Sequence, residues 1–191
     1  MQIVLLASGS GSLAQSIIDA QSSDKLDLEI LELISDKKCQ ALERASAAGI
    51  ATRFLPMLED RSVWDAQLIE AVAKLNPDLV VSVGFMRILS GAFVSKFPTI
   101  NTHPALLPNF PGAHAVRDAL KSGASVTGST VHWVDAGIDT GAIISQKEVE
   151  VLPQDDEASL HERIKIVERE LIVETLQSFI AHGLPRRTNE S

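Results

Sequence analysis

The chain has 191 residues, of which 45% are apolar and 22% are charged, and its formal net charge at pH 7 is -8. A chain of this length can bury about 70% of its unfolded surface, so we expect one globular domain over residues 1–185, followed by a flexible tail over residues 186–191. No basic cluster is larger than Arg186-Arg187, and this acidic balance disfavours a nucleic-acid partner.

Two further features of the composition concern the cellular compartment. The single cysteine, Cys39, excludes an internal disulfide and is typical of a reducing cytosol. The apolar N-terminus, Met1 to Ala7, is too short for a signal peptide or a membrane span. We therefore expect a cytoplasmic protein with no membrane partner.

The first half of the chain alternates between apolar strands and amphipathic helices. The run from Gln2 to Ala7 has no polar alternation, which is typical of a strand buried on both faces of a parallel sheet. The same reasoning predicts strands at 2–7, 28–34, 52–55 and 79–83, and helices at 13–20, 38–48 and 60–75. This order predicts an α/β fold with right-handed crossovers and a doubly wound, mostly parallel sheet.

The second half of the chain predicts a mixed arrangement. A strand ends near Thr99-Ile100, and a helix is expected at 113–121. Alternating patterns predict strands at 126–134 and 142–151, which we expect to pair as a hairpin. One long helix is expected at 155–182, and Gly183-Leu184-Pro185 ends it.

Three segments that follow strands are candidates for chemistry. Ser8 to Ser12 lies between a strand and a helix, where free amides and glycines favour phosphate binding, although the segment also fits simple helix capping or a loose G-x-G-x-x-A dinucleotide fingerprint. Gly84 to Ser90 could hold a flat ring system or cover the core. We expect both segments to share a cleft with Asn101-Thr102-His103-Pro104.

The segment Asn101 to Pro104 carries the strongest chemical signal. Strand alternation turns Asn101 and His103 to the same side, and Pro104 then forces a turn. An amide can donate to an oxyanion, and an imidazole can move a proton near neutral pH. Asp139 is the natural partner of His103, whose pKa a carboxylate would raise, but an Asp between glycines is also common in turns.

Taken together, these motifs resemble the phosphoribosylglycinamide formyltransferases, a branch of the folate-dependent formyltransferase family. The resemblance covers about residues 1 to 180 and rests on motifs that occur in the same order as in the family. These are the segments 8–12, 84–90, 101–108, 110–112 and 135–141. It implies the Rossmann-like formyltransferase fold and transfer of the formyl group of 10-formyltetrahydrofolate to the amine of phosphoribosylglycinamide, as a step of purine biosynthesis.

The resemblance also implies a role for each site residue. Asn101 would hold the formyl oxygen, His103 would carry the proton, and Asp139 would orient His103. The substrate phosphate would bind at Gly11, Ser12 and Leu13, where many members have Asn in place of Leu13. The ribotide would also face Lys165, Ile166, Val167 and Glu168. The folate pocket would be lined by Arg61, Met86, Arg87, Ile88, Leu89, Asn101, Asp135, Ala136, Gly137, Ile138 and Asp139.

The remaining expectations concern partners and rival functions. The reaction needs no metal, and the other histidines lack the spacing of a zinc site; His132 is interpreted as a strand side chain. The protein is expected to bind only small molecules, as a monomer or homodimer. Two alternatives stay open: a 10-formyltetrahydrofolate hydrolase, and a non-catalytic nucleotide-binding module in which Asp36 would bind the ribose.

Overall fold

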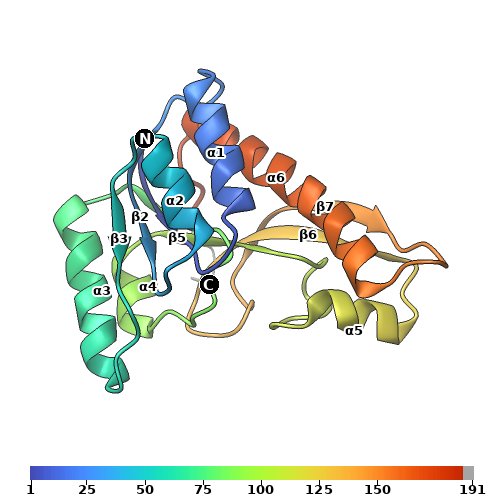
Figure 1. Ribbon diagram of the computed structural model, residues 1–191. Coiled ribbons are helices and arrows are strands. Elements are labelled where there is room, and N and C mark those ends of the chain that lie inside the picture. The colour runs from blue at the N-terminus through green and yellow to red at the C-terminus, as the bar shows by residue number, and fades with distance from the viewer. Residues whose placement is uncertain (187–191) are drawn as a thin grey trace. The chain divides into compact units, whose positions relative to one another are not determined.

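The structure is a computed structural model that describes residues 1–186 (Figure 1). It divides into two compact units, of which the first ends at Ile100 and the second begins at Asn101. Strand β5 (Thr99–His103) crosses from the first unit into the second. The predicted tail over 186–191 falls almost wholly outside the described residues; of it only Arg186 is described, and it belongs to no helix or strand.

The first unit confirms the predicted alternation of strands and helices. Its strands β1, β2, β3 and β4 are parallel and lie in the order β3-β2-β1-β4. In chain order, the elements up to β5 are β1 (Gln2–Leu6), α1 (Ser12–Ser22), β2 (Glu29–Ser35), α2 (Gln40–Ala47), β3 (Thr52–Phe54), α3 (Arg61–Leu75), β4 (Leu79–Ser82) and α4 (Gly91–Lys96).

Burial explains why these segments are strands, and the strand order indicates where a ligand can bind. Residues Ile3 to Leu6 of β1 and Leu79 to Val81 of β4 are fully buried, as expected for the inner strands of a parallel sheet. The chain leaves β1 toward β2 on one side, and β4 lies on its other side. Ligands bind at such a reversal of strand order, beyond the carboxyl ends of the strands, and here that place is formed by the loops after β1 and β4.

Helix α4 is an element that the sequence analysis did not predict. It spans only six residues and begins with a glycine, so it shows no helical periodicity. The hydroxyl of Ser90 caps it by accepting the N–H of Phe93 at 3.3 Å. Phe93 and Val94 are buried, and this burial anchors the short helix in the core.

The second unit contains the predicted hairpin and the long C-terminal helix. Its elements are the end of β5, α5 (Ala115–Ser122), β6 (Val126–Trp133), β7 (Ile143–Glu150) and α6 (Glu157–His182). Strands β6 and β7 pair antiparallel, and α6 packs against both of them and against α5 (Figure 1). The mixed C-terminal half and the long helix are therefore confirmed.

A small apolar cluster fixes α6 in the second unit. Val116, Val149, Leu160 and Ile164 form its buried part, and Leu120, Val151 and Val167 pack against it. The helix starts with a capping box, in which Asp156 accepts the N–H of Ser159 and the Ser159 hydroxyl accepts the N–H of Asp156. Packing and capping together place the middle of α6 over the hairpin.

Candidate active site

The serine-glycine loop of the first unit has the backbone geometry of an anion site. Gly11 adopts φ 72°, and a Cβ there would lie 2.6 Å from the Cα of Ala41, so only glycine fits. Arg44 donates to the carbonyl of Ser10 at 2.9 Å and holds the loop against α2. No side chain caps the start of α1, and its first amides, including that of Leu13, can bind an anion.

A buried hydrogen-bond network joins this loop to the one after β4. The Ser8 hydroxyl donates to Asp36 at 2.5 Å and accepts the N–H of Met86 at 2.9 Å. Arg87 donates to the other oxygen of Asp36 at 2.6 Å. The Ser8 N–H also donates to the Gly84 carbonyl at 3.0 Å. The two loops therefore meet, as predicted, and Asp36 ties them together.

This network argues against the hypothesis of a nucleotide-binding module. That hypothesis required the Asp36 carboxylate to accept a ribose hydroxyl, but the side chain is fully buried and both of its oxygens already bind Ser8 and Arg87. The guanidinium of Arg87 is likewise bound to Asp36. This contact fixes the conformation of the loop after β4.

Arg61, which the resemblance implies for the folate pocket, contacts the same loop. It donates to the carbonyl of Ile88 and to Asp65, and its guanidinium stacks over the ring of Trp64 at 4.8 Å. Met86 and Ile88 are 65% and 58% exposed, whereas Leu89 is buried. The loop therefore exposes two large apolar side chains, while Leu89 is part of the core.

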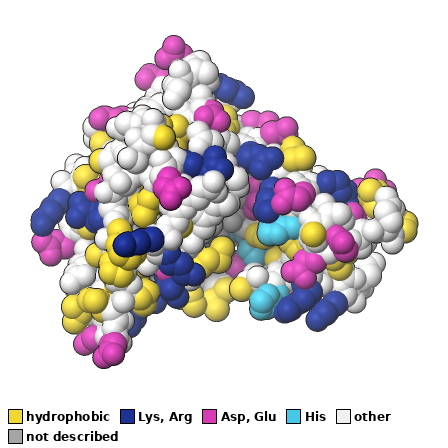
Figure 2. Space-filling model, viewed as in Figure 1, with side chains coloured by type: hydrophobic (Ala, Val, Ile, Leu, Met, Phe, Trp, Pro, Cys, Tyr) yellow, Lys and Arg dark blue, Asp and Glu magenta, His cyan; other side chains and the backbone are white. Residues whose placement is uncertain are grey.

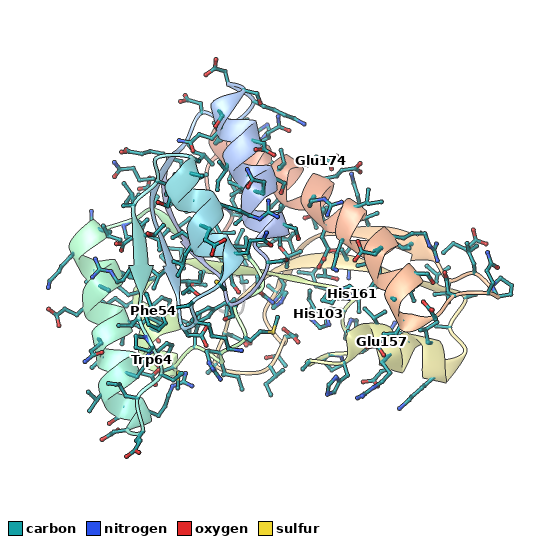
Figure 3. The ribbon with its side chains drawn as sticks, viewed as in Figure 1. Phe54, Trp64, His103, Glu157, His161 and Glu174 are labelled. Carbon is teal, nitrogen blue, oxygen red and sulfur yellow. The ribbon has the colours of Figure 1, made fainter. Side chains whose placement is uncertain are left out.

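The second unit brings the three predicted catalytic residues together. The Nδ1 atom of His103 lies 3.3 Å from Oδ2 of Asp139, although the two residues are 36 positions apart in the sequence. His103 is 4% exposed at the end of β5, and Figure 3 shows it inside the unit. Asn101 lies two residues earlier on the same strand. Strand alternation and the loop after β6 thus create one cluster.

The partners of His103 define where its protons are. Its Nε2 lies 2.8 Å from the carbonyl of Phe110, and a carbonyl only accepts, so Nε2 carries a hydrogen. Its Nδ1 faces the Asp139 carboxylate, which also accepts the N–H of Gly112 at 2.8 Å. Both nitrogens of His103 therefore face acceptors, which is the arrangement that suits the protonated ring.

Asp139 raises the pKa of His103, as predicted, but the net pKa is lowered. Burial lowers the pKa of His103, and it outweighs the Phe110 carbonyl and Asp139, which raise it; nearby His132 lowers it further. Burial would raise the pKa of Asp139, but its contacts with His132, Gly112 and His103 together hold that pKa below the ordinary value. A buried imidazolium that faces two acceptors is ready to release its proton.

His132 belongs to this cluster, although the sequence analysis gave it no part in the site. It lies in β6, as expected, but its Nε2 is 3.3 Å from the amide nitrogen of Asn101 and 3.5 Å from Oδ1 of Asp139. The alternating pattern of β6 gave no sign of these contacts. A histidine at the end of a strand that leads into the Asp139 loop was the available signal.

The loop from Asp135 to Asp139 is held by its own side chains. Asp135 accepts the N–H of Gly137 at 2.9 Å and the hydroxyl of Thr140 at 2.8 Å. Asp139 adopts φ 54°, a left-handed conformation that Asp tolerates, and this turns its carboxylate toward His103. Ala136, Gly137 and Ile138 are exposed, so the outer part of the loop is open to a ligand.

Comparisons with known proteins agree with this geometry. A family model described as formyl transferase matches residues 1–176. The chain belongs to the formyl transferase family. It is 49% identical over 188 residues to a phosphoribosylglycinamide formyltransferase of Mycobacterium tuberculosis, covering 96% of this chain and 86% of the relative.

Two further proteins extend the likeness. The phosphoribosylglycinamide formyltransferase of Escherichia coli is 42% identical over 173 residues, covering 88% of this chain and 82% of the relative. The crystal structure of glycinamide ribonucleotide transformylase 1 from Symbiobacterium toebii superposes with a TM-score of 0.94 at 36% identity, covering 98% of this chain and 91% of that one. The fold predicted from the resemblance is confirmed.

Helix α6 carries the remaining predicted residues of this formyl transferase. Glu168 is half-buried, and burial raises its pKa to about 7 against the opposing effect of Lys165 and Arg169. Ile166 is 51% exposed, and Lys165 pairs with Glu162 at 2.7 Å. The side chain of Val167 packs against the apolar cluster, so a structural role accounts for it. On the face of the molecule seen in Figure 2, histidine side chains gather among charged ones over α5 and α6.

Within residues 1–186, no group of three or more His, Cys, Asp or Glu side chains is placed to hold a metal ion. Over the same residues, no helix combines the length and the low polarity that crossing a bilayer demands.

Proposed function

We propose that this formyl transferase moves the formyl group of 10-formyltetrahydrofolate to the amine of phosphoribosylglycinamide through Asn101, His103 and Asp139. The observation that carries the proposal is the 3.3 Å contact between His103 and Asp139, beside the Asn101 amide on the same strand. The substrates are small molecules, as in the relatives named for this activity. A folate is the formyl donor that the family implies.

The reaction moves one proton overall, from the amine to the folate nitrogen. The amine attacks the formyl carbon, and the formyl oxygen becomes an oxyanion. As the bond between this carbon and the folate nitrogen breaks, protonated His103 gives its proton to that nitrogen. The ammonium formed in the attack returns a proton to His103. Asp139 stabilises the charged ring throughout, and burial favours its release of the proton.

Asn101 is proposed to stabilise the oxyanion. A side-chain amide that donates to such an oxygen contributes about 2.7–4 kcal/mol to the transition state. Asn101 is half-buried at the end of β5, where water competes less with this hydrogen bond than at an open surface. Bringing the two substrates together contributes more, of the order of 7–11 kcal/mol at best.

The acceptor substrate is proposed to bind through its phosphate and its amine. The phosphate would accept the amides of Gly11, Ser12 and Leu13, at a loop that only glycine can form. The ribotide would face Lys165, Ile166 and Glu168, and would meet Val167 only through its backbone. If the acceptor amine arrives as an ammonium, a carboxyl with a pKa of about 7, such as Glu168, can take up that extra proton before the attack; this proton is separate from the one that His103 carries.

The folate is proposed to bind beside two loops. Met86 and Ile88 offer exposed apolar side chains, Leu89 and Arg61 support them, and Arg87 fixes the loop through Asp36. The exposed residues Ala136, Gly137 and Ile138, between Asp135 and Asp139, would form the other wall. A common cleft for these segments is a requirement of the proposal and stays a prediction.

A coupled assay tests the proposal and separates it from hydrolysis. Loss of the folate formyl group is followed with and without phosphoribosylglycinamide, and the formylated product is quantified. We expect formyl loss that depends on the acceptor and equals product formation. Formate release at the same rate without acceptor would show a hydrolase instead. Titration with NAD is the control for nucleotide binding, and we expect no saturable binding.

A further inference from the structure

We infer that His132 is a positioning residue that sets the orientation of the Asn101 side-chain amide. This inference rests on the proposed function, in which Asn101 donates to the oxyanion. The amide of an asparagine can turn by half a rotation and present its oxygen where its nitrogen should be. An oxygen in that place would repel an oxyanion, so something must select the correct orientation.

The position of His132 in β6 suits this task. The residue is 2% exposed, and the pairing of β6 with β7 is irregular at this point. Val131 pairs with Ser145, but His132 pairs with Ile143, so β7 contains one extra residue beside the histidine. Such bulges change the direction of a neighbouring side chain. At this irregular point of the pair, the imidazole of His132 contacts Asn101 of β5.

The contact of Nδ1 determines the tautomer of the ring. The Nδ1 atom of His132 lies 2.9 Å from the carbonyl oxygen of Trp133. That oxygen can only accept, so Nδ1 must carry a hydrogen and donate it. The Trp133 peptide is itself held in place, because its N–H donates to the Ala142 carbonyl at 2.9 Å and Gly141 packs directly on its carbonyl.

The tautomer in turn determines what Asn101 can do. With the hydrogen on Nδ1, the Nε2 atom of neutral His132 has a lone pair and accepts. It lies 3.3 Å from the Asn101 amide nitrogen, which must be the donor. The amide uses one N–H for His132 and keeps the second N–H for the formyl oxygen. The reversed amide would place two acceptors against each other.

Asp139 competes with Asn101 for the same ring nitrogen. Its Oδ1 lies 3.5 Å from Nε2 of His132, while its Oδ2 faces His103. If Nε2 of His132 carried a hydrogen, it would donate a hydrogen bond to Asp139. The Asn101 nitrogen would then have no acceptor at His132. The shorter of the two contacts at Nε2 is the one to Asn101. In the proposed productive tautomer, Nε2 of His132 therefore accepts from Asn101, and Asp139 keeps its contacts with His103 and the Gly112 N–H.

The tautomer can be measured directly in the full chain. Long-range ¹H–¹⁵N correlation spectra of protein with ¹⁵N-labelled histidine distinguish the two ring tautomers, and the His132→Gln variant identifies the signal among the five histidines. We expect the ring of His132 to carry its hydrogen on Nδ1 and to accept at Nε2. A hydrogen on Nε2, alone or with a charged ring, would overturn the inference. This result does not depend on which reaction the protein catalyses.

A double-mutant cycle tests whether His132 acts through Asn101. His132→Leu removes the acceptor, whereas His132→Gln offers an amide oxygen near the place of Nε2. We expect kcat to fall by about 10- to 100-fold in the Leu variant, with KM little changed, and to recover to within about fivefold of wild type in the Gln variant. In an Asn101→Ala background, His132→Leu should add almost nothing.

The outcomes of this cycle are distinguishable from a failure of the proposed function or of folding. Equal losses from His132→Leu with and without Asn101 would show independent action and refute the positioning role. Absence of formyl transfer in the wild type would refute the proposed function, while the NMR spectrum would still decide the tautomer. The unfolding midpoint of each variant is the control, and a Gln variant that folds like wild type yet is as slow as the Leu variant also refutes the role.

Discussion

The two polar clusters of this protein, one in each unit, are built on opposite principles. In the first unit donors meet separate acceptors: the Ser8 hydroxyl and Nε of Arg87 donate to different oxygens of Asp36. In the second unit acceptors surround His103, and both Asn101 and Asp139 reach Nε2 of His132. A network in which donors and acceptors match fixes a loop. A network with more acceptors than hydrogens can take up or release a proton.

The largest effect is expected from removing the proton carrier of the second cluster. We expect His103→Ala to lower kcat by about 10²- to 10⁴-fold, since general acid–base catalysis contributes that much, and Asp139→Ala to approach the same loss. Steady-state kinetics with both substrates measures this. His114→Ala, an exposed histidine before α5, is the matched control. Near-normal turnover in a folded His103→Ala or Asp139→Ala protein would remove the catalytic assignment.

A somewhat smaller effect is expected at the amide beside the proton carrier. Asn101→Ala removes one oxyanion donor, and we expect kcat to fall by about 10²- to 10³-fold with KM changed little, because the interaction forms in the transition state. A rise in KM with unchanged kcat would instead show that Asn101 only binds the folate. The pH profile of the remaining activity should keep the wild-type shape, because His103 and Asp139 stay in place.

The helices and strands differ in how well the sequence predicts them. The doubly wound first half was predictable because buried strands such as Gln2–Leu6 are apolar without interruption. Helix α4 was not, because six residues starting with Gly91 have no measurable period and only Ser90 as a cap. Local pattern thus gives the long elements and misses those that depend on tertiary packing.

The candidate site follows the same division. The sequence placed His103 and Asp139 together through the family resemblance, and the structure brings them within 3.3 Å. The sequence could name the carboxylate beside the imidazole but not the burial that reverses its effect on the pKa. It also missed His132, whose contact with Asn101 joins residues 31 positions apart through a bulge in another strand pair.

The first cluster should respond to mutation in a different quantity from the second. Asp36→Asn leaves Arg87 without its buried charge partner, and we expect the free energy of unfolding to fall by about 1–3 kcal/mol. Because the network fixes the Met86 loop, KM for the folate should rise about tenfold while kcat at saturation changes by less than about threefold. Urea unfolding and steady-state kinetics measure both.

The control for this variant separates the loop from general destabilisation. Asp60→Ala removes the N-cap of α3 in the same unit and should also lower the free energy of unfolding, while it leaves the Asp36 network unchanged. A folate KM that rises equally in both variants would mean that Asp36 acts only through stability. A large fall in kcat for Asp36→Asn would erase the distinction between the two clusters.

The smallest effect is expected on the pH dependence of stability, through Glu168 on α6. Its pKa is raised from 4.5 to about 7 by burial, so the folded state holds a proton that the unfolded chain has released between these values. The stability from this group is complete below pH 4.5 and is lost as the pH rises through 7. From pH 6 to 7 the loss is about 1 kcal/mol. The pKa of His103 is lowered from 6.5, which gives the opposite slope over the same range.

Comparing Glu168→Gln with a matched variant isolates this contribution. The free energy of unfolding is measured in urea at pH 6 and pH 7. Glu168→Gln removes the contribution that falls with pH, so the free energy of unfolding should rise more from pH 6 to pH 7 than in wild type. Glu174→Gln, an exposed glutamate of the same helix that pairs with Lys147, should keep the wild-type slope. If both variants kept that slope, Glu168 would titrate like a surface carboxylate, and its proposed role as acceptor of the substrate proton would lose its physical basis.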